Sequence, residues 1–197
     1  MPTIYYIRHG ETQWNADGRL QGQQDIPLND LGRKQAAGAG GILAGLFARD
    51  GRSETSLAFI ASPLGRARST MELVRGSLKL PPTDYAIDDR LREIGYGDWE
   101  GSTLAQMQAS DPTVFAARQA DKWTVPPPGG ESYAQVQARM RDWYDQLRAD
   151  TVAVAHGGTA RALMVSLDFE TPDSAADLTI EQGAVYVFGD GGVEKYC

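Results

Sequence analysis

Near its start the chain reads Ile4-Tyr5-Tyr6-Ile7-Arg8-His9-Gly10. The four apolar residues predict a short buried strand, because a continuous apolar run bounded by polar residues or glycine suits a strand that is covered on both faces. The predicted strand ends at a charged pair, Arg8 and His9, and a glycine follows. In open α/β sheets ligands bind beyond the carboxyl ends of the strands, so this end is a candidate binding site.

Two further apolar runs, at residues 57–61 and 151–155, predict buried strands separated by helical segments. Strands that alternate with helices indicate a three-layer α/β/α fold with a mainly parallel central sheet. The last residues, 184–188 and 193–196, flank a glycine-rich turn and predict a β-hairpin. The length of 197 residues predicts one domain over residues 1–197. Residues 102–130 break the alternation with two short helical pieces and a proline-rich stretch, which predicts a small helical cap or lid inserted in that domain.

Three helices can be placed from their caps. Asn29 or Asp30 caps a helix that should run to about residue 48, although its glycines oppose helix formation. Pro63 suits the first turn of a helix through about residue 74. Ser132 and Gln135 form a capping box ahead of a third helix. Apolar residues recur behind that box on one helical face and should contact the core: Tyr133, Val136, Met140, Trp143 and Leu147.

Composition restricts the partners of the protein. The 26 Asp and Glu against 19 Lys and Arg give a net charge of −7, which disfavours nucleic acid as a partner. The cations are 15 Arg and only four Lys, and arginine suits bidentate binding of phosphate or carboxylate. The single cysteine, Cys197, excludes an internal disulfide and a multi-cysteine zinc site. We see no signal peptide and no apolar run of the ~20 residues that span a bilayer, so we expect a cytoplasmic protein with no membrane partner.

The chain has only two histidines, and each follows a predicted strand and precedes a glycine. They are His9 and His156. Each could be an isolated hydrogen-bonding histidine, but the repeated position favours one shared site. A metal pair is an alternative that neighbouring Arg8 opposes, because a guanidinium repels a cation. Arg66 follows the strand at residues 57–61, and the segment after His156 opens a helix whose free N–H groups favour an anion. Histidines, arginines and a helix N-terminus at one sheet edge indicate an anion site, most simply for phosphate.

These residues lie in motifs that resemble those of the histidine phosphatase superfamily, the phosphoglycerate mutase-like proteins. The first is Arg8-His9-Gly10-Glu11-Thr12-Gln13-Trp14-Asn15. The others follow in family order along nearly the whole chain: Asp25-Ile26-Pro27-Leu28-Asn29, Ser62-Pro63-Leu64-Gly65-Arg66-Ala67-Arg68-Ser69-Thr70, Leu91-Arg92-Glu93-Ile94-Gly95-Tyr96-Gly97-Asp98-Trp99-Glu100-Gly101, Pro128-Gly129-Gly130-Glu131-Ser132 and His156-Gly157-Gly158-Thr159-Ala160-Arg161.

The resemblance implies a catalytic set in which His9 is the nucleophile and is phosphorylated on a ring nitrogen. Arg8, Arg66 and His156 would hold the non-bridging phosphate oxygens, and Glu93 would protonate the leaving oxygen and later serve as base. It further implies five substrate-binding residues: Asn15, Gln21, Gly22, Tyr96 and Gly157. Arg161 is expected to support the structure, as is Glu11; Glu11, Asp98 and Glu100 are rival candidates for the acid. The scheme needs no metal and no other cofactor.

Within this family the sequence favours a phosphatase over a mutase. Gly158 stands where cofactor-dependent phosphoglycerate mutases typically have Asn, and the cap has Arg118 and Lys122 as its only bases, without an adjacent arginine pair. A mutase and a non-catalytic phospho-ligand binding domain remain the alternatives. Apolar cap residues should either form a rim around an uncharged organic part of the substrate or pack in the core: Met107, Phe115, Trp123 and Val125. The expected partner is a small phosphomonoester; the C-terminal hairpin offers either a homodimer edge or a plain sheet edge.

Overall fold

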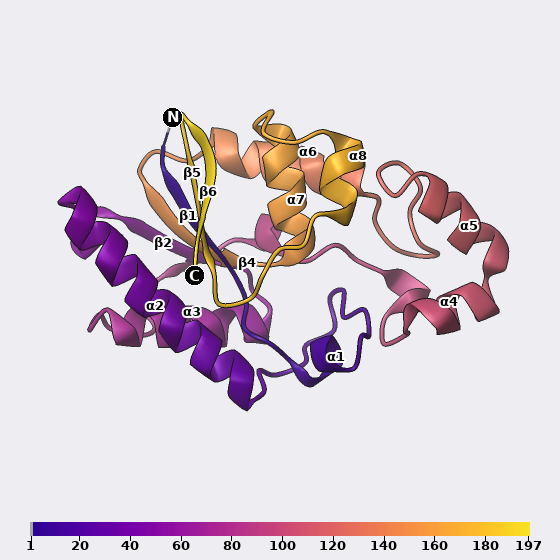
Figure 1. Ribbon diagram of the computed structural model, residues 1–197, viewed down its shortest axis with the longest axis horizontal. Helices are drawn as coiled ribbons and strands as arrows, with labels where there is room; N and C mark the ends of the chain where they lie inside the picture. Colours follow the sequence, from indigo (N-terminus) through magenta and orange to yellow (C-terminus); the bar gives the residue numbers. More distant parts are fainter. Residues whose placement is uncertain (1) are drawn as a thin grey trace.

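A six-stranded sheet runs through the protein in the computed structural model, which describes residues 2–197 (Figure 1). Its strand order is β3-β2-β4-β1-β5-β6. The first four of these pair in parallel, whereas β5 and β6 are antiparallel. The predicted mainly parallel sheet and the C-terminal hairpin are therefore confirmed. The strands are β1 (Ile4–Arg8), β2 (Ala58–Ala61), β3 (Ala86–Ile87), β4 (Thr151–Ala155), β5 (Val185–Gly189) and β6 (Gly192–Tyr196).

The register of β1 and β4 brings the two histidines together. Arg8 lies opposite Ala155 at the carboxyl ends of these neighbouring strands, and the His9 backbone N–H donates to the Ala155 carbonyl at 2.9 Å. His9 and His156 therefore follow directly from adjacent parallel strands. On the other side of β4, the Ser62 N–H continues the ladder from β2 by donating to the Val154 carbonyl at 3.0 Å. Three strand ends thus meet at one edge of the sheet.

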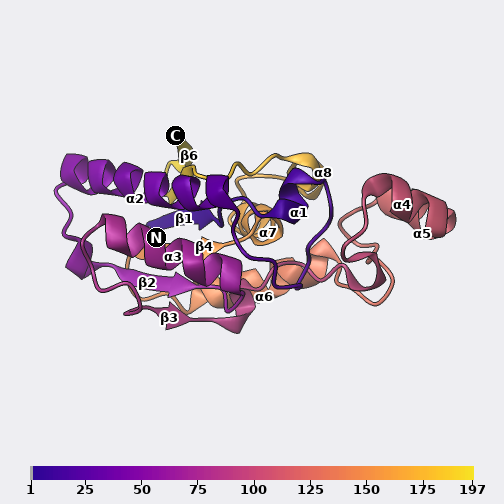
Figure 2. The same cartoon turned by 90° about the horizontal axis from the view of Figure 1, so that it is seen from below.

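Helices cover both faces of the sheet and complete the three layers that the sequence predicts (Figures 1 and 2). On one face α2 (Asp30–Asp50) and α3 (Gly65–Ser77) pack over a core that includes Tyr5 and Phe47, whose rings meet edge to face. On the other face lie α6 (Tyr133–Asp145), α7 (Gly157–Ser166) and α8 (Pro172–Asp177), over a core that contains Trp143. Successive side chains of β1 point to opposite faces of the sheet, so this one strand contributes to both cores.

The helix caps follow the sequence except at α3. Asn29 caps α2 by accepting from the Gly32 N–H, and Ser132 forms the capping box of α6 with Gln135. The prediction that Pro63 lies in the first turn of the helix that runs through about residue 74 was wrong. Leu64 is extended at the N-cap, and α3 begins at Gly65, because the ladder bond made by Ser62 keeps this segment extended beyond β2.

The segment at residues 102–130 contains two helices, α4 (Leu104–Ser110) and α5 (Pro112–Ala120), which lie beyond α1 (Gln13–Ala16) and away from the sheet (Figure 2). The described residues also form three single-turn 3₁₀ helices: η1 (Glu54–Ser56), η2 (Asp89–Leu91) and η3 (Gly97–Trp99). Within residues 2–197, no helix combines the length and the apolar character needed to cross a membrane.

Candidate active site

A cavity of about 180 Å³ lies at the carboxyl ends of the central strands. Nine of the ten residues that the sequence assigns to the site line it: Arg8, His9, Asn15, Gln21, Gly22, Arg66, Glu93, Tyr96 and Gly157. The tenth, His156, is fully buried directly behind the wall, with its ring centroid 5.1 Å from that of His9. Residues that are far apart in the sequence therefore surround one small polar space.

His9 is held in the protonation state that a nucleophile needs. Its Nδ1–H donates to the Gly10 carbonyl at 2.7 Å, and its Nε2 accepts a hydrogen bond from Arg66 Nε at 3.2 Å. These partners assign the lone pair to Nε2. Burial, together with the positive charges of Arg66 and Arg8, holds the pKa of His9 well below its ordinary value of 6.5. The imidazole is therefore neutral at pH 7, with Nε2 as its reactive atom.

Gly10 and Gly32 explain why this motif needs glycine after the histidine. A Cβ on Gly10 would lie 2.2 Å from the Gly32 carbonyl oxygen, and a Cβ on Gly32 would lie 2.1 Å from that of Glu11. The loop after β1 therefore rests directly on the first turn of α2. The Glu11 carboxylate also joins this loop to α2, because it accepts a hydrogen bond from Asn29 Nδ2, at the N-cap of the helix, at 2.8 Å. Glu11 therefore has the structural role expected of it.

Two arginines line the cavity, Arg66 from a buried position and Arg8 from a partly buried one. Arg66 is 1% exposed, and its two terminal nitrogens donate to the carbonyls of Gln24 and Gly22 at 2.6 and 2.7 Å. Arg8 Nη1 donates to the Ile180 carbonyl at 2.7 Å, while its buried Nε has no hydrogen-bond partner among the described residues. Burial lowers the pKa of both guanidinium groups, yet both stay charged because an arginine titrates far above neutral pH.

His156 is positioned by Tyr6 and Ser62. The Tyr6 hydroxyl accepts from the His156 N–H at 3.0 Å and donates to its carbonyl at 2.7 Å, which fixes the backbone at the start of α7. Ser62 Oγ lies 2.8 Å from His156 Nε2 and itself accepts from the Leu64 N–H. The Ser62 hydroxyl can donate to Nε2, and in that tautomer Nδ1 carries the imidazole proton. That Nδ1 is buried without a partner, and burial holds the pKa of His156 well below 6.5.

Glu93 is the one carboxylate among the described residues that line the cavity. Its Oε1 accepts the backbone N–H groups of Ile94 and Gly158, at 2.9 and 3.0 Å. Both bonds go to one oxygen, and Oε2 has no hydrogen-bond partner among the described residues. The rival candidates Glu100 and Asp98 do not line the cavity. Glu100 Oε1 accepts hydrogen bonds from the Gln23 and Tyr96 N–H groups, and Asp98 is exposed to solvent. The expected anion site at the α7 N-terminus is thus partly taken, because Glu93 already binds the Gly158 N–H.

The remaining cavity residues supply neutral polar groups. Asn15 Oδ1 accepts from the Thr12 N–H and from Gln182 Nε2, so its amide nitrogen is left as a donor. Gln21 is buried, and its Oε1 has no partner among the described residues. Gly22 adopts φ of +52° in the same loop, where its carbonyl receives Arg66.

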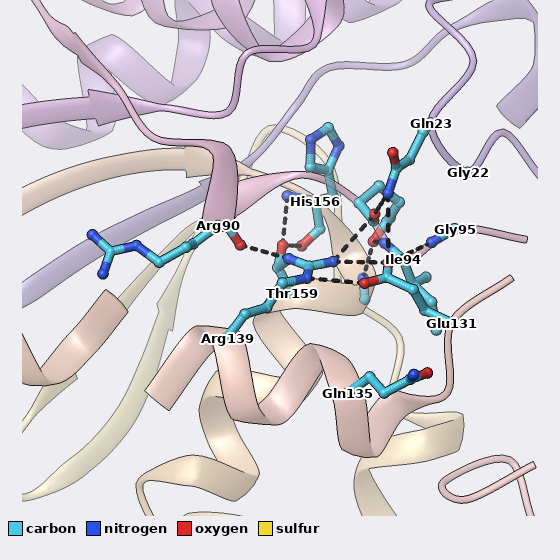
Figure 3. Close-up of polar contacts among 12 residues, drawn as sticks. Gly22, Gln23, Arg90, Ile94, Gly95, Glu131, Gln135, Arg139, His156 and Thr159 are labelled. Carbon is cyan, nitrogen blue, oxygen red and sulfur yellow. Dashed lines mark hydrogen bonds and ion pairs between the residues drawn. The ribbon is translucent and has the colours of Figure 1, made fainter. Parts of the chain in front are cut away.

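An ion pair behind the cavity holds the backbone on both sides of Glu93 (Figure 3). Arg139 on α6 donates to the carbonyls of Arg90 and Glu93, at 2.5 and 3.3 Å. It also pairs with Glu131 at 3.2 Å, and Glu131 Oε2 accepts the Gly95 N–H at 2.8 Å. This pair is a positioning device, because it touches the loop that carries Glu93 and not the cavity itself.

Four contributors have no role assigned from the sequence: Arg19, Ser62, Glu131 and Arg139. Arg19 lines the cavity while its Nη1 donates to the Gly101 carbonyl at 2.7 Å, and no motif signals it. Ser62 and Glu131 stand in recognised motifs, but only the structure shows what they bind. Arg161, expected as a support, does donate to the Leu178 carbonyl and the Tyr133 hydroxyl, and it also lines the cavity.

The sequence is similar to those of known proteins. A model of the histidine phosphatase superfamily (branch 1) matches residues 4–192. Glucosyl-3-phosphoglycerate phosphatase of Mycobacterium tuberculosis (strain ATCC 25618 / H37Rv) is 36% identical over 177 residues, which cover 83% of this chain and 74% of that protein. The 2,3-bisphosphoglycerate-dependent phosphoglycerate mutase of Beijerinckia indica is 32% identical over 196 residues, covering 94% of this chain and 90% of that protein.

The fold is shared with a solved relative. The structure of mycobacterial glucosyl-3-phosphoglycerate phosphatase in complex with VO3 superimposes with a TM-score of 0.81 at 30% identity, covering 100% of this chain and 98% of that one.

Proposed function

The chain belongs to the histidine phosphatase superfamily, and from that membership we propose that it is a metal-independent phosphomonoesterase that works through a phosphohistidine on His9. One observation carries the proposal. Two buried side-chain nitrogens without partners, Arg8 Nε and His156 Nδ1, lie around a neutral histidine whose reactive nitrogen is Nε2, and Nδ1 is a donor in the tautomer that has Ser62 donating to Nε2. Buried donors are normally satisfied, and a phosphate group offers the oxygen acceptors that both need.

In the first step the Nε2 lone pair of His9 attacks phosphorus and the bond from phosphorus to the ester oxygen breaks. Arg8, Arg66 and His156 hold the non-bridging oxygens, where negative charge must be stabilised. The alcohol leaves with a proton from Glu93, because an alkoxide is a poor leaving group. Arg66 Nε, which bonds to Nε2 before substrate arrives, exchanges that bond for a phosphate oxygen.

In the second step a water molecule attacks the phosphohistidine. Glu93, now a carboxylate, accepts a proton from that water, and the bond from phosphorus to Nε2 breaks. Inorganic phosphate leaves, and His9 and Glu93 return to their starting states. The residues used are all protein side chains, so we expect chelators to leave the rate unchanged.

A mutase is the second candidate, because a phosphoglycerate mutase is 32% identical to this chain. Gly158 favours the phosphatase. A Cβ at this position would lie 2.4 Å from Glu93 Oε1, so an asparagine there would displace the carboxylate. A mutase must also bind a doubly anionic bisphosphate, and of the two cap bases only Arg118 lacks an ion pair among the described residues. Arg118 donates to the Val125 carbonyl, and Lys122 pairs with Asp177.

The test is phosphate release from 3-phosphoglycerate, glucosyl-3-phosphoglycerate and 4-nitrophenyl phosphate, with the His9→Ala variant beside the unchanged protein. The glucosyl compound is included because a relative is named for it. We expect release that is insensitive to EDTA and lost in His9→Ala, and acid-labile, base-stable ³²P on the protein after a rapid quench.

Each other outcome selects an alternative. Conversion of 3- to 2-phosphoglycerate in the presence of bisphosphoglycerate, without net release, would make the protein a mutase. Phosphate binding without any turnover would make it a phospho-ligand binding domain. We further propose that the protein works in the cytoplasm, since a chain with one cysteine needs no oxidising compartment; cell fractionation tests this.

A further inference from the structure

A second cavity, of about 290 Å³, adjoins the phosphate cavity on the side of the cap helices. The two cavities share three lining residues: Leu20, Tyr96 and Arg161. A phosphate held at His9 would therefore direct its ester oxygen and the attached alcohol past these residues. The second cavity is large enough to hold more than a three-carbon chain.

One wall of the second cavity is apolar. Trp99 and Phe115 form it with ring centroids 6.2 Å apart, together with Met107 and Leu104. Leu104 is 59% exposed, which is unusual for a large apolar side chain in the described part of the protein. The cap residues thus divide between the two roles expected from the sequence. Met107 and Phe115 line the cavity, whereas Trp123 stacks on Tyr133 with ring centroids 5.2 Å apart.

The other wall is polar and positive. Arg118 is only 7% exposed, and its guanidinium carbon lies 5.8 and 5.9 Å from the ring centroids of Tyr96 and Tyr133. Its Nη1 is fixed by the Val125 carbonyl at 2.6 Å. Arg118 and Arg161 form no ion pair with another described residue, whereas Lys122 is neutralised by Asp177. An occupant with one apolar face and an edge of oxygen acceptors satisfies both walls.

We propose that the second cavity binds the alcohol part of the substrate, and that the substrates are phosphate monoesters of ring-bearing alcohols. The ring lies against Phe115 and Trp99, and its oxygen substituents face Arg118 and Tyr133. This inference rests on the proposed phosphatase function. A three-carbon phosphate leaves the aromatic wall uncovered and gains nothing from it.

The test compares esters whose leaving alcohols have similar acidity, so that chemistry does not mask binding. Glycerol 3-phosphate lacks a ring, 2-phenylethyl phosphate has an apolar ring, and glucose 6-phosphate has a ring with hydroxyl groups. We expect kcat/KM to be higher by about tenfold or more for 2-phenylethyl phosphate, because its apolar ring is buried against the aromatic wall. Glucose 6-phosphate should also exceed glycerol 3-phosphate, because its ring contacts the same wall and its hydroxyl groups reach the polar one. Glucose 6-phosphate should also lose activity with Arg118→Gln.

Two variants on the apolar wall locate the effect. Phe115→Ala should lower kcat/KM for both ring compounds by about tenfold and leave glycerol 3-phosphate within about twofold. Leu104→Ser changes an exposed side chain, so it keeps the fold, and it should lower the same two values by a smaller factor. Thr113→Ala, on the exposed side of α5, is the matched control and should change none of them.

Three results would overturn the substrate class: equal kcat/KM for all three esters, losses in Phe115→Ala and Leu104→Ser that are the same for every ester, or no loss in either variant. Failure of the phosphatase proposal looks different, because then no ester releases phosphate, 4-nitrophenyl phosphate included.

Discussion

Position 158 has space for the hydrogen of a glycine but not for a Cβ atom. A Cβ there would lie 2.4 Å from Glu93 Oε1 and 2.8 Å from Ile94 Cγ2, and the Gly158 N–H is one of the two donors that hold the carboxylate. The position of the acid is therefore set by the absence of a side chain on a different element.

Gly158→Ala should displace Glu93 without touching the phosphate donors. We expect kcat for an alkyl phosphate to fall by about 100-fold, the lower end of what general acid catalysis contributes, with little change in KM. The loss for 4-nitrophenyl phosphate should be smaller, because that leaving group needs no proton. Steady-state kinetics on both esters measures this, with Gly41→Ala as control because its added Cβ meets nothing within 4 Å. Equal losses on both esters would contradict the assignment.

Ser62 bonds to His156 Nε2 from behind the cavity, and where its hydroxyl donates it keeps the imidazole proton on Nδ1. With Ser62→Ala the Nε2 atom loses its donor, so the proton is free to move from Nδ1 to Nε2 and the donor aimed at phosphate weakens. We expect KM to rise about tenfold, the value of one hydrogen bond to a charged group, with kcat changed less. Nitrogen-15 shifts of the imidazoles report the tautomer directly, and the chain has only two histidines to assign. An unchanged Nδ1–H tautomer in the variant would refute the role of Ser62.

At the scale of elements, α2 forms over 21 residues despite several glycines. Its contact with α3 explains one of them. A Cβ on Gly40 would lie 2.6 Å from Ser77 Cβ and 2.9 Å from the Val74 carbonyl, so this glycine allows the two helices to approach closely. Gly41 and Gly45 face open space, and nothing in the packing requires them.

These positions should respond in opposite directions to alanine. Gly41→Ala should raise the free energy of unfolding by about 0.5–1 kcal/mol, because alanine has the higher helix propensity and the added methyl meets no neighbour. Gly40→Ala should lower it by about 1–3 kcal/mol, because the methyl must push α3 away. Urea unfolding of both variants measures the difference. A stabilised Gly40→Ala would show that the two helices do not need this contact.

The sequence predicted the elements better than it predicted their ends or their contacts. Apolar runs located β1, β2 and β4, but β3 has only two residues, Ala86 and Ile87, and depends on pairing with β2. The start of α3 was misplaced because a ladder bond outweighed the preference of proline for a first helical turn. Arg139 gave no signal at all, since it meets the Glu93 loop only after α6 packs against it.

At the scale of the whole molecule, two neutral imidazoles lie in the interior beside arginines. Burial and those charges hold the pKa of both His9 and His156 well below 6.5 in the folded state. The unfolded chain binds protons at these groups near pH 6.5, whereas the folded chain does not. Protonation therefore stabilises the unfolded state as the pH falls through 6.5, and the free energy of unfolding decreases.

We expect the free energy of unfolding to fall between pH 7 and pH 5.5, approaching ~1.4 kcal/mol per pH unit for each histidine. Urea titrations at closely spaced pH values measure the slope, and carboxylates contribute little in this window because they titrate at lower pH. His9→Gln should reduce the slope by about half. A stability that does not change over this range would mean that the two histidines take up protons in the folded state.

The hydrogen bond from Arg66 Nε to His9 Nε2 joins the group that must attract phosphate to the atom that must attack it. Without a ligand, the guanidinium shields the lone pair. A ligand with anionic oxygens offers Arg66 Nε a better acceptor than His9 Nε2. When Nε bonds to such an oxygen, the lone pair of Nε2 becomes available for attack. Recognition and activation are then one event, and the resting histidine is protected from neutral electrophiles that reach the cavity.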